Sequence, residues 1–250
     1  MLKKLIILFV FIISIQLFAF EIGEKLTFQI KYGIIKAGEA TLQINTHTYK
    51  DSIECYKIES LAKTNSFFDN IYKVRDRIES IWDKNELIAR RFTKKLQEGS
   101  YRQYRIHFYY PDQNFTIYTK FGRKTKKFKE KRIDIPANTQ DIMSALYYLR
   151  LQEFTVGDTL TINVTADGRN YPADVIVHRI EEIETIFGNK DCFVVEPILK
   201  GDAIFKQTGK IFVWLTADEH KIPVKMSSKI VFGSFKAILK DAENIPYKKK

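Results

Sequence analysis

The sequence has few of the residues on which most enzyme and metal sites depend. Its 250 residues include 2 cysteines and 4 histidines, and the histidines stand apart at positions 47, 107, 178 and 220. No G-x-S-x-G, H-E-x-x-H, paired C-x-x-C or D-x-D-x-D-G motif occurs, and neither cysteine has an evident base. We therefore expect no catalytic residues of these classes, no metal site and no cofactor.

Long apolar runs are also missing, with one exception at the N terminus. Leu5–Ile13 is an unbroken apolar stretch that follows Lys3 and Lys4 and precedes Ala19. This pattern over residues 1–19 is typical of a secretory signal peptide, and it is shorter than the about 20 apolar residues that span a membrane. No cysteine follows the run, which excludes lipid attachment there. We expect an exported, periplasmic protein, with the segment either cleaved after Ala19 or kept as an anchor.

Proline and glycine are scarce, at 6 and 11 residues, and the composition is that of an ordinary globular protein. The 13 tyrosines and 19 phenylalanines favour β-strands. The formal net charge is +11, and removing Lys3 and Lys4 leaves +9. Outside the cytoplasm this charge indicates anionic lipid head groups or acidic envelope polymers as partners, and no nucleic acid. The alternative is that the surplus lysines only keep the protein soluble and protect sheet edges.

Most of the chain alternates between apolar and polar residues, as in strands with one wet face. Examples are the segments 23–44, 71–82 and 101–110, which are separated by short polar turns. We expect 12–14 such strands.

Asn138–Leu151 is the one segment with the period of a helix. Ile142, Leu146 and Leu149 form an apolar stripe that we expect to face the core. Asn138 or Thr139 is the expected N-cap.

Two halves of the chain resemble each other on either side of this helix. The matched positions are Gly23 and Gly157, Cys55 and Cys192, and Trp82 and Trp214, at offsets of 134, 137 and 132 residues. The alternative is that two unrelated β meanders with similar turns look alike.

We predict a mainly β fold, either a curved antiparallel sheet or an open β-barrel, in one domain over residues 20–245. It consists of pseudo-repeats at about 23–135 and 157–240, with the helix at about 139–151 packed on the concave side and a basic tail at 246–250. The hydroxyls of Tyr147 and Tyr148 then need water, a partner or a ligand, and the helix becomes a candidate wall of a cavity.

Export makes a disulfide between Cys55 and Cys192 chemically permissible. The alternative, two buried free thiols, stays open because the sequence does not give the geometry.

Asp76 is the most informative single carboxylate. Strand alternation places it with Val74, Ile78 and Trp82, and a carboxylate on an apolar face needs a partner. Arg90 or Arg91 on the next strand could form a structural ion pair with it. The functional alternative is that Asp76 and Arg90 line a cavity and hold a polar head group.

Two surface segments are further candidates. Residues 120–132 carry one acid against eight basic residues, and the predicted anionic-surface contacts are Lys124, Lys126, Lys127, Lys129 and Lys131. Phe67 and Phe68 lie in the polar segment 65–70, which we expect to be a loop. They either guard the mouth of a cavity or insert at an interface, or they fold back onto the core. For the basic segment, the alternative is a solvated hairpin that resists edge pairing.

Several segments resemble the bacterial exported proteins grouped as domain of unknown function 3108 (DUF3108). They include GEKLTFQIKYGIIKAGEATL at 23–42, NSFFDNIYKVRDRIES at 65–80 and QDIMSALYYLR at 140–150. GDTLTINVTADGRNYP at 157–172, DCFVVEP at 191–197 and IPVKMSSKIVFGSFKAIL at 222–239 continue the resemblance in order. It implies a cell-envelope location and a mostly antiparallel β fold, and it supplies no catalytic residue.

These observations give three hypotheses. The first is a periplasmic protein that binds an amphipathic or anionic envelope component, such as a lipid or lipoglycan, without catalysis, with membrane contact at its periphery. The second is a scaffolding protein of the envelope, whose protein partner the sequence does not name. The third is an enzyme that acts on envelope polysaccharide through Asp76 and another acid.

Overall fold

The computed structural model describes residues 19–200, 209–229 and 234–249. Within these residues the chain forms fifteen strands, two α-helices and one 3-10 turn. In chain order the elements are β1 (Lys25–Tyr32), β2 (Ile35–Tyr49), β3 (Ile53–Thr64), α1 (Ser66–Tyr72), β4 (Arg75–Asp83), β5 (Ala89–Glu98), β6 (Tyr101–Tyr110), η1 (Pro111–Gln113), β7 (Phe115–Gly122), β8 (Lys127–Asp134), β9 (Gln140–Asp141), α2 (Ile142–Arg150), β10 (Thr159–Ala166), β11 (Arg169–Thr185), β12 (Gly188–Leu199), β13 (Ile211–Thr216), β14 (Pro223–Lys229) and β15 (Ser234–Glu243).

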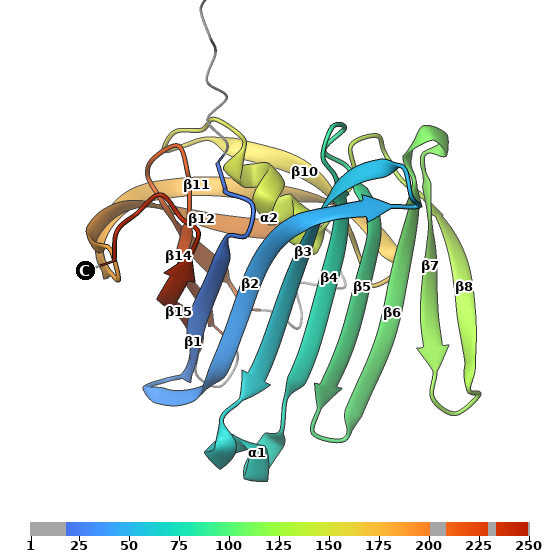
Figure 1. Cartoon of the computed structure of the whole chain (residues 1–250), viewed down its shortest axis with the longest axis horizontal. Helices are drawn as coiled ribbons and strands as arrows, with labels where there is room; N and C mark the ends of the chain where they lie inside the picture. Colours follow the sequence, from blue (N-terminus) through green and yellow to red (C-terminus); the bar gives the residue numbers. More distant parts are fainter. Residues whose placement is uncertain (1–18, 201–208, 230–233, 250) are drawn as a thin grey trace, which may run out of the picture.

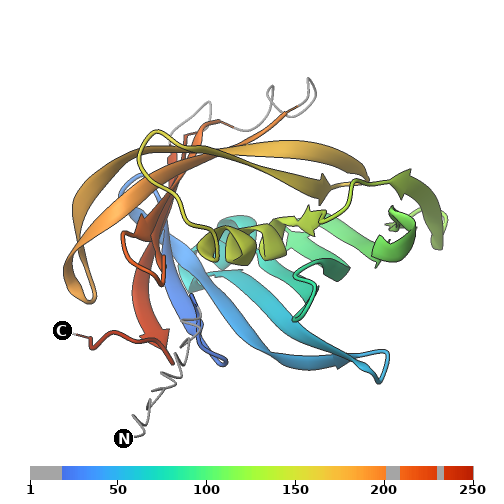
Figure 2. The same cartoon turned by 90° about the horizontal axis from the view of Figure 1, so that it is seen from above.

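All described strands belong to one sheet, in the order β8-β7-β6-β5-β4-β3-β2-β1-β15-β14-β13-β12-β11-β10-β9. Neighbours pair antiparallel except for the two-residue β9, which runs parallel to β10. β8 and β9 follow each other in the chain but lie at opposite edges of the sheet. Because residues 135–139 can span at most about 18 Å, the sheet must curl until its edges approach each other. Figures 1 and 2 show this open, curved sheet, which does not close into a barrel.

The β10–β11 turn contacts strands that lie far from it in the order of the sheet. Asp167 in this turn forms ion pairs with Arg105 on β6 and with Lys94 on β5. The next amide, of Gly168, donates a hydrogen bond to Nε2 of His107 at 3.4 Å. Strands far apart in the sheet order are therefore joined by charge pairs and by a backbone hydrogen bond.

The central helix lies on the concave side, between the two walls of the sheet (Figure 2), as predicted. Its cap differs from our prediction. The N-cap is Asp141, which accepts from the amides of Met143 and Ser144, while the Ser144 hydroxyl accepts from the Asp141 amide. Asn138 and Thr139 lie one turn too early because the two residues of β9 follow them.

The buried face of α2 also differs from the predicted stripe. Leu149 is buried as expected, but Ile142 is 38% exposed. The fully buried residues near the end of the helix are Tyr147 and Arg150. Strands of the curled sheet lie on more than one side of this short helix, so a single apolar stripe does not describe its contacts.

The main core fills the space between α2 and the sheet. Phe20 packs edge-on against Tyr56 at 5.4 Å and against Tyr147 at 5.1 Å between ring centroids, and Tyr56 in turn contacts Trp82. Tyr148 is partly buried at the margin of this cluster. Around Tyr147 the helix is therefore part of a packed interface.

The two halves of the chain begin in the same way. The amide of Gly23 donates to the carbonyl of Ile44, and that of Gly157 donates to the carbonyl of Val177, both at 2.8 Å. Both glycines have positive φ, +87° and +97°, a conformation that glycine adopts without strain. The correspondence agrees with a sheet made of two similar halves.

Two segments differ from our predictions in local structure. Residues 66–72 form the helix α1, capped by the Asn65 side chain, in place of the predicted loop. The basic tail is not free along its whole length, because the Tyr247 ring packs on Phe187 at 4.9 Å and Lys249 pairs with Asp241. Short segments such as these take their structure from the surface on which they lie.

Candidate functional site: a basic groove on the outer face of the sheet

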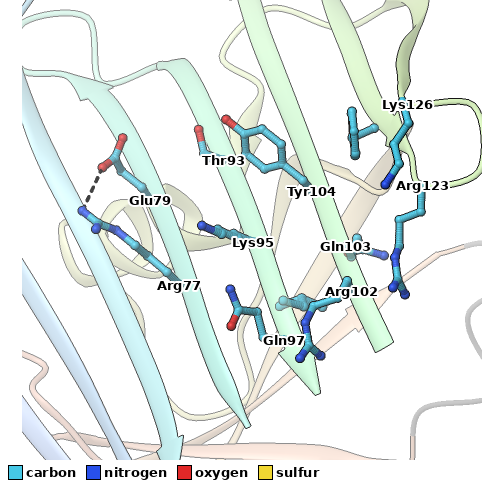
Figure 3. A pocket seen from close by; sticks show the side chains of 12 residues that line it. Arg77, Glu79, Thr93, Lys95, Gln97, Arg102, Gln103, Tyr104, Arg123 and Lys126 are labelled. Atoms are coloured by element: carbon cyan, nitrogen blue, oxygen red, sulfur yellow. Dashed lines mark ion pairs between the residues drawn. The ribbon is translucent and has the colours of Figure 1, made fainter. Parts of the chain in front are cut away.

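A groove of about 550 Å³ lies on the face of β4, β5, β6 and β7 that is turned away from α2. Alternation along β4 fixes this orientation, because Ser80 points inward to Asp141 on the helix side (Oγ to Oδ2, 2.6 Å). Arg77 and Glu79 therefore point outward. Figure 3 shows their side chains with those of Lys95 and Tyr104 along neighbouring strands, with α2 behind the sheet. The lining residues are Arg77, Glu79, Thr93, Lys95, Leu96, Gln97, Arg102, Gln103, Tyr104, Phe121, Arg123 and Lys126.

The groove is strongly basic. Five of its lining residues are lysines or arginines, and Glu79 is the one acid among them. Glu79 is paired with Arg91 at 2.7 Å and with Lys57 at 3.2 Å. It also pairs with Arg77 of the groove at 3.9 Å (Figure 3), and Arg77 pairs with Glu59 at 2.9 Å. Burial opposes ionisation of Glu79, but the hydrogen bonds from Arg91 and Lys57 outweigh it and lower the pKa of this carboxyl. Arg77 is therefore partly neutralised, and the other four basic side chains, Lys95, Arg102, Arg123 and Lys126, give the groove its positive charge.

An aromatic cluster lies at the β7–β8 side of the groove. Phe128 contacts Tyr104 at 5.8 Å and Phe121 at 5.1 Å between ring centroids. Register explains the cluster, because Phe121 pairs directly with Phe128 across the two strands. Cations beside aromatic faces suit a ligand that has both an anionic group and an apolar part.

Of the predicted anionic-surface lysines, only Lys126 lines this groove. Lys124 and Lys127 lie in or beside the same β7–β8 turn, and Lys129 lies on the exposed strand β8. Lys131 instead reaches the β10–β11 turn, where its Nζ donates to the carbonyl of Gly168 at 3.4 Å. Sequence reasoning missed Arg77, Lys95, Arg102 and Tyr104 as groove residues. The polar face of each alternating strand was a usable signal, but the sequence does not give the strand register that aligns these faces.

The predicted pairing of Asp76 with Arg90 or Arg91 is wrong. Nε and Nη2 of Arg90 both donate to Oδ2 of Asp83, at 3.0 and 2.8 Å, and Arg91 pairs with Glu79 on the outer face. Asp76 instead accepts from the backbone amide of Gln97 at 2.9 Å. Burial, together with the neighbouring Asp76 carboxylate, raises the pKa of Glu98. Asp76 and Arg90 therefore do not form a common site.

The aromatic candidates separate as well. Phe67 is exposed and Phe68 half-buried on α1, with their rings 5.3 Å apart. Tyr147 lies inside the core, where its hydroxyl donates to Glu24 at 3.2 Å. The structure thus places Phe67 and Phe68 at one end of the sheet, and the side chain of Tyr147 in the core between α2 and the sheet.

Cys55 on β3 and Cys192 on β12 are both buried free thiols, so the disulfide alternative is wrong. Burial raises the pKa of Cys55 to about 11 and that of Cys192 to about 12. Thiols in this state are poor nucleophiles near neutral pH. Within the described residues, no group of three or more His, Cys, Asp or Glu side chains is arranged to hold a metal ion.

Residues 27–240, most of the chain, match the family described as "Protein of unknown function (DUF3108)". The chain belongs to the DUF3108 family. No curated protein matches it. A solved structure from Brucella abortus, a β-barrel-like protein of the domain of unknown function DUF1849, is similar to this DUF3108 protein with a TM-score of 0.62 and 11% identity, covering 90% of this chain and 99% of its own.

A second solved structure, from Bacteroides fragilis, is described as an exported protein with a YmcC-like fold. It aligns with a TM-score of 0.36 and 9% identity over 90% of this chain and 98% of its own. The Brucella likeness shows that the barrel-like fold of this DUF3108 protein occurs in another family. At 11% identity it shows the fold alone. In the described part of the chain, no helix is long and apolar enough to cross a membrane.

Proposed function

We propose that this protein is an exported cell-envelope protein that binds an anionic, amphipathic envelope component, a lipid or a lipoglycan, without catalysis. The observation that carries the proposal is the outer groove, where five basic side chains converge beside the cluster of Tyr104, Phe121 and Phe128. Arginine and lysine side chains hold phosphate or carboxylate groups through charge-assisted hydrogen bonds. The aromatic faces offer contact area to an acyl chain or a sugar ring.

Export rests on the basic start and apolar run before Ala19. Phe20, which directly follows the expected cleavage site, is buried in the main core, and Ala19 is buried there as well, so cleavage after Ala19 removes one core residue. An extracytoplasmic location supplies the anionic ligands that the groove fits.

The test measures the affinity of the purified protein for phosphatidylglycerol with short acyl chains, at lipid concentrations below those at which the lipid forms micelles. The Lys95→Glu/Lys126→Glu variant reverses two exposed charges in the groove and should bind at least about tenfold more weakly. Its matched control is Lys200→Glu/Lys210→Glu, which changes the net charge equally outside the groove and should bind like the wild type. Equal affinity of all three proteins would refute the groove as the site. Lipid mass spectrometry of the protein extracted from cells would identify the natural ligand.

The scaffolding alternative has one observation in its favour. β8 is an edge strand of the described sheet, and seven of its eight residues are exposed. A strand of a partner protein could pair with this edge. A stable protein complex that survives the groove charge reversal and is lost when Lys129 is replaced by proline would favour this alternative.

A further inference from the structure

We propose that one end of the sheet docks onto an anionic lipid bilayer and inserts apolar side chains into it. We call this end the turn end. It consists of the β1–β2 turn, α1, the β5–β6 turn and the β7–β8 turn, which lie together at the bottom of Figure 1. The apolar residues on which its test rests, Phe67 and Ile71, do not line the groove, so this proposal and ligand binding in the groove can fail separately.

The turn end exposes large apolar side chains from separate segments. Ile34 in the β1–β2 turn is 94% exposed, and Phe67 and Ile71 on α1 are 66% and 67% exposed. Tyr101 at the start of β6 and Phe128 near the start of β8, beside the next two turns, are exposed as well. Apolar side chains gathered from four segments on one surface mark a contact with a partner or a membrane.

The structure of α1 holds its apolar residues away from the core. Arg75 at the start of β4 pairs with Asp69 inside the helix, and Asp69 also accepts from the Thr64 hydroxyl at the end of β3. The Asn65 side chain caps the same helix through the amide of Phe68. Since α1 is tied to both flanking strands, Phe67 and Ile71 do not turn inward without breaking these contacts. Their exposure is therefore built into the fold.

Charge identifies an anionic membrane as the occupant. Exposed basic residues accompany the apolar ones in every segment: Lys36, Lys73, Arg102, Arg123, Lys124 and Lys127. The acids in or beside these segments are Asp69, which is paired with Arg75, and the neighbouring Glu98 and Asp76, where burial and the Asp76 carboxylate raise the pKa of Glu98. An apolar surface ringed by cations matches the interface of a bilayer that contains acidic lipids. An apolar protein partner would not require this excess of positive charge.

The test is flotation of the full, processed protein with vesicles of phosphatidylethanolamine and phosphatidylglycerol, compared with vesicles of phosphatidylcholine alone. The wild type should bind the anionic vesicles and not the neutral ones. Phe67→Ser/Ile71→Ser should weaken binding at least about tenfold, because two inserted side chains are lost. The control Val156→Ser/Ile180→Ser, at residues 48% and 49% exposed on other parts of the molecule, should bind like the wild type.

A second measurement reports insertion directly. Phe67→Cys and Val156→Cys can each be labelled with an environment-sensitive fluorophore, because Cys55 and Cys192 are buried. The label at position 67 should shift to shorter emission wavelengths on anionic vesicles, and the label at 156 should not. Equal binding to both vesicle types, unchanged binding of the Phe67/Ile71 variant, or the absence of a shift at position 67 would overturn the proposal. Matching thermal unfolding of all variants verifies that they fold.

Discussion

Arg150, in the last turn of α2, forms a buried bidentate ion pair with Glu24, just before β1. Its two terminal nitrogens lie 2.6 and 2.7 Å from the two carboxylate oxygens of Glu24. The same guanidinium donates to the backbone carbonyls of Ala19 and His220. One side chain thus connects the helix to the start of the folded chain and to the β13–β14 loop.

Breaking this pair should destabilise the protein strongly. Glu24→Gln leaves a buried guanidinium without its counter-charge, and we expect a loss of about 3–5 kcal/mol in the free energy of unfolding, measured with urea. The Glu24→Leu/Arg150→Met variant removes both charges and should lose less than Glu24→Gln alone. A single Glu24→Gln variant as stable as the wild type would contradict this account.

His107 should make the protein sensitive to acid. Burial lowers its pKa to about 4, so the unfolded chain binds a proton at higher pH than the folded one does. Stability from this group is therefore present above about pH 6.5 and is lost as the pH falls towards 4, by about 3 kcal/mol in total. Burial also raises the pKa of Asp141 to about 6, which acts in the opposite direction. The measurement is thus the difference in unfolding free energy between the wild type and His107→Gln, which retains Asp141. This difference in unfolding free energy should shrink by about 3 kcal/mol between pH 7 and pH 4.

The β10–β11 turn should require glycine at position 168 for two reasons. Its φ is +83°, and an added Cβ would lie 2.8 Å from the ring of Tyr118. Gly157 has a similar φ of +97° but nothing within 4 Å of its Cβ position, so it is a matched control. Gly157→Ala should cost about 1 kcal/mol from backbone strain alone, and Gly168→Ala about 1–3 kcal/mol more. Equal losses in urea unfolding would show that the contact with Tyr118 relaxes freely.

The cap of α2 should contribute measurably to stability. Asp141→Ala removes the acceptor of two backbone amides and of the Ser80 hydroxyl. We expect a loss of about 2 kcal/mol or more, of which the cap itself accounts for about 1–2 kcal/mol. Asp141→Asn keeps a side-chain oxygen and should retain part of this stability in thermal unfolding. An Asp141→Ala variant that unfolds at the wild-type temperature would rule out this role.

The two thiols should resist modification in the folded protein. Their burial and raised pKa predict no alkylation by iodoacetamide at pH 8, and two alkylations after unfolding without a reductant. Intact mass spectrometry measures both. A protein that remains unmodified after unfolding would contain the disulfide that the structure lacks.

The sequence by itself determined the class of the fold. Period-two alternation identified the strands, and the period of 142, 146 and 149 identified the one long helix, because both patterns follow from local backbone geometry. The matched positions Gly23 and Gly157 also indicated two similar halves. Each of these signals lies within one segment of the chain or in the comparison of two segments.

Only the tertiary structure decided which polar residues meet. Asp76 and Arg90 were predicted to pair on neighbouring strands, yet each contacts a different partner. Strand register and turn geometry set the distances between such side chains. The groove has the same origin, since Arg77, Lys95 and Arg102 lie on three strands and align only when those strands pair. The burial of Arg150 is the clearest case. A cation in the last turn of a helix suits the helix dipole at the surface, but the curled sheet enclosed it with Glu24, 126 residues earlier in the chain.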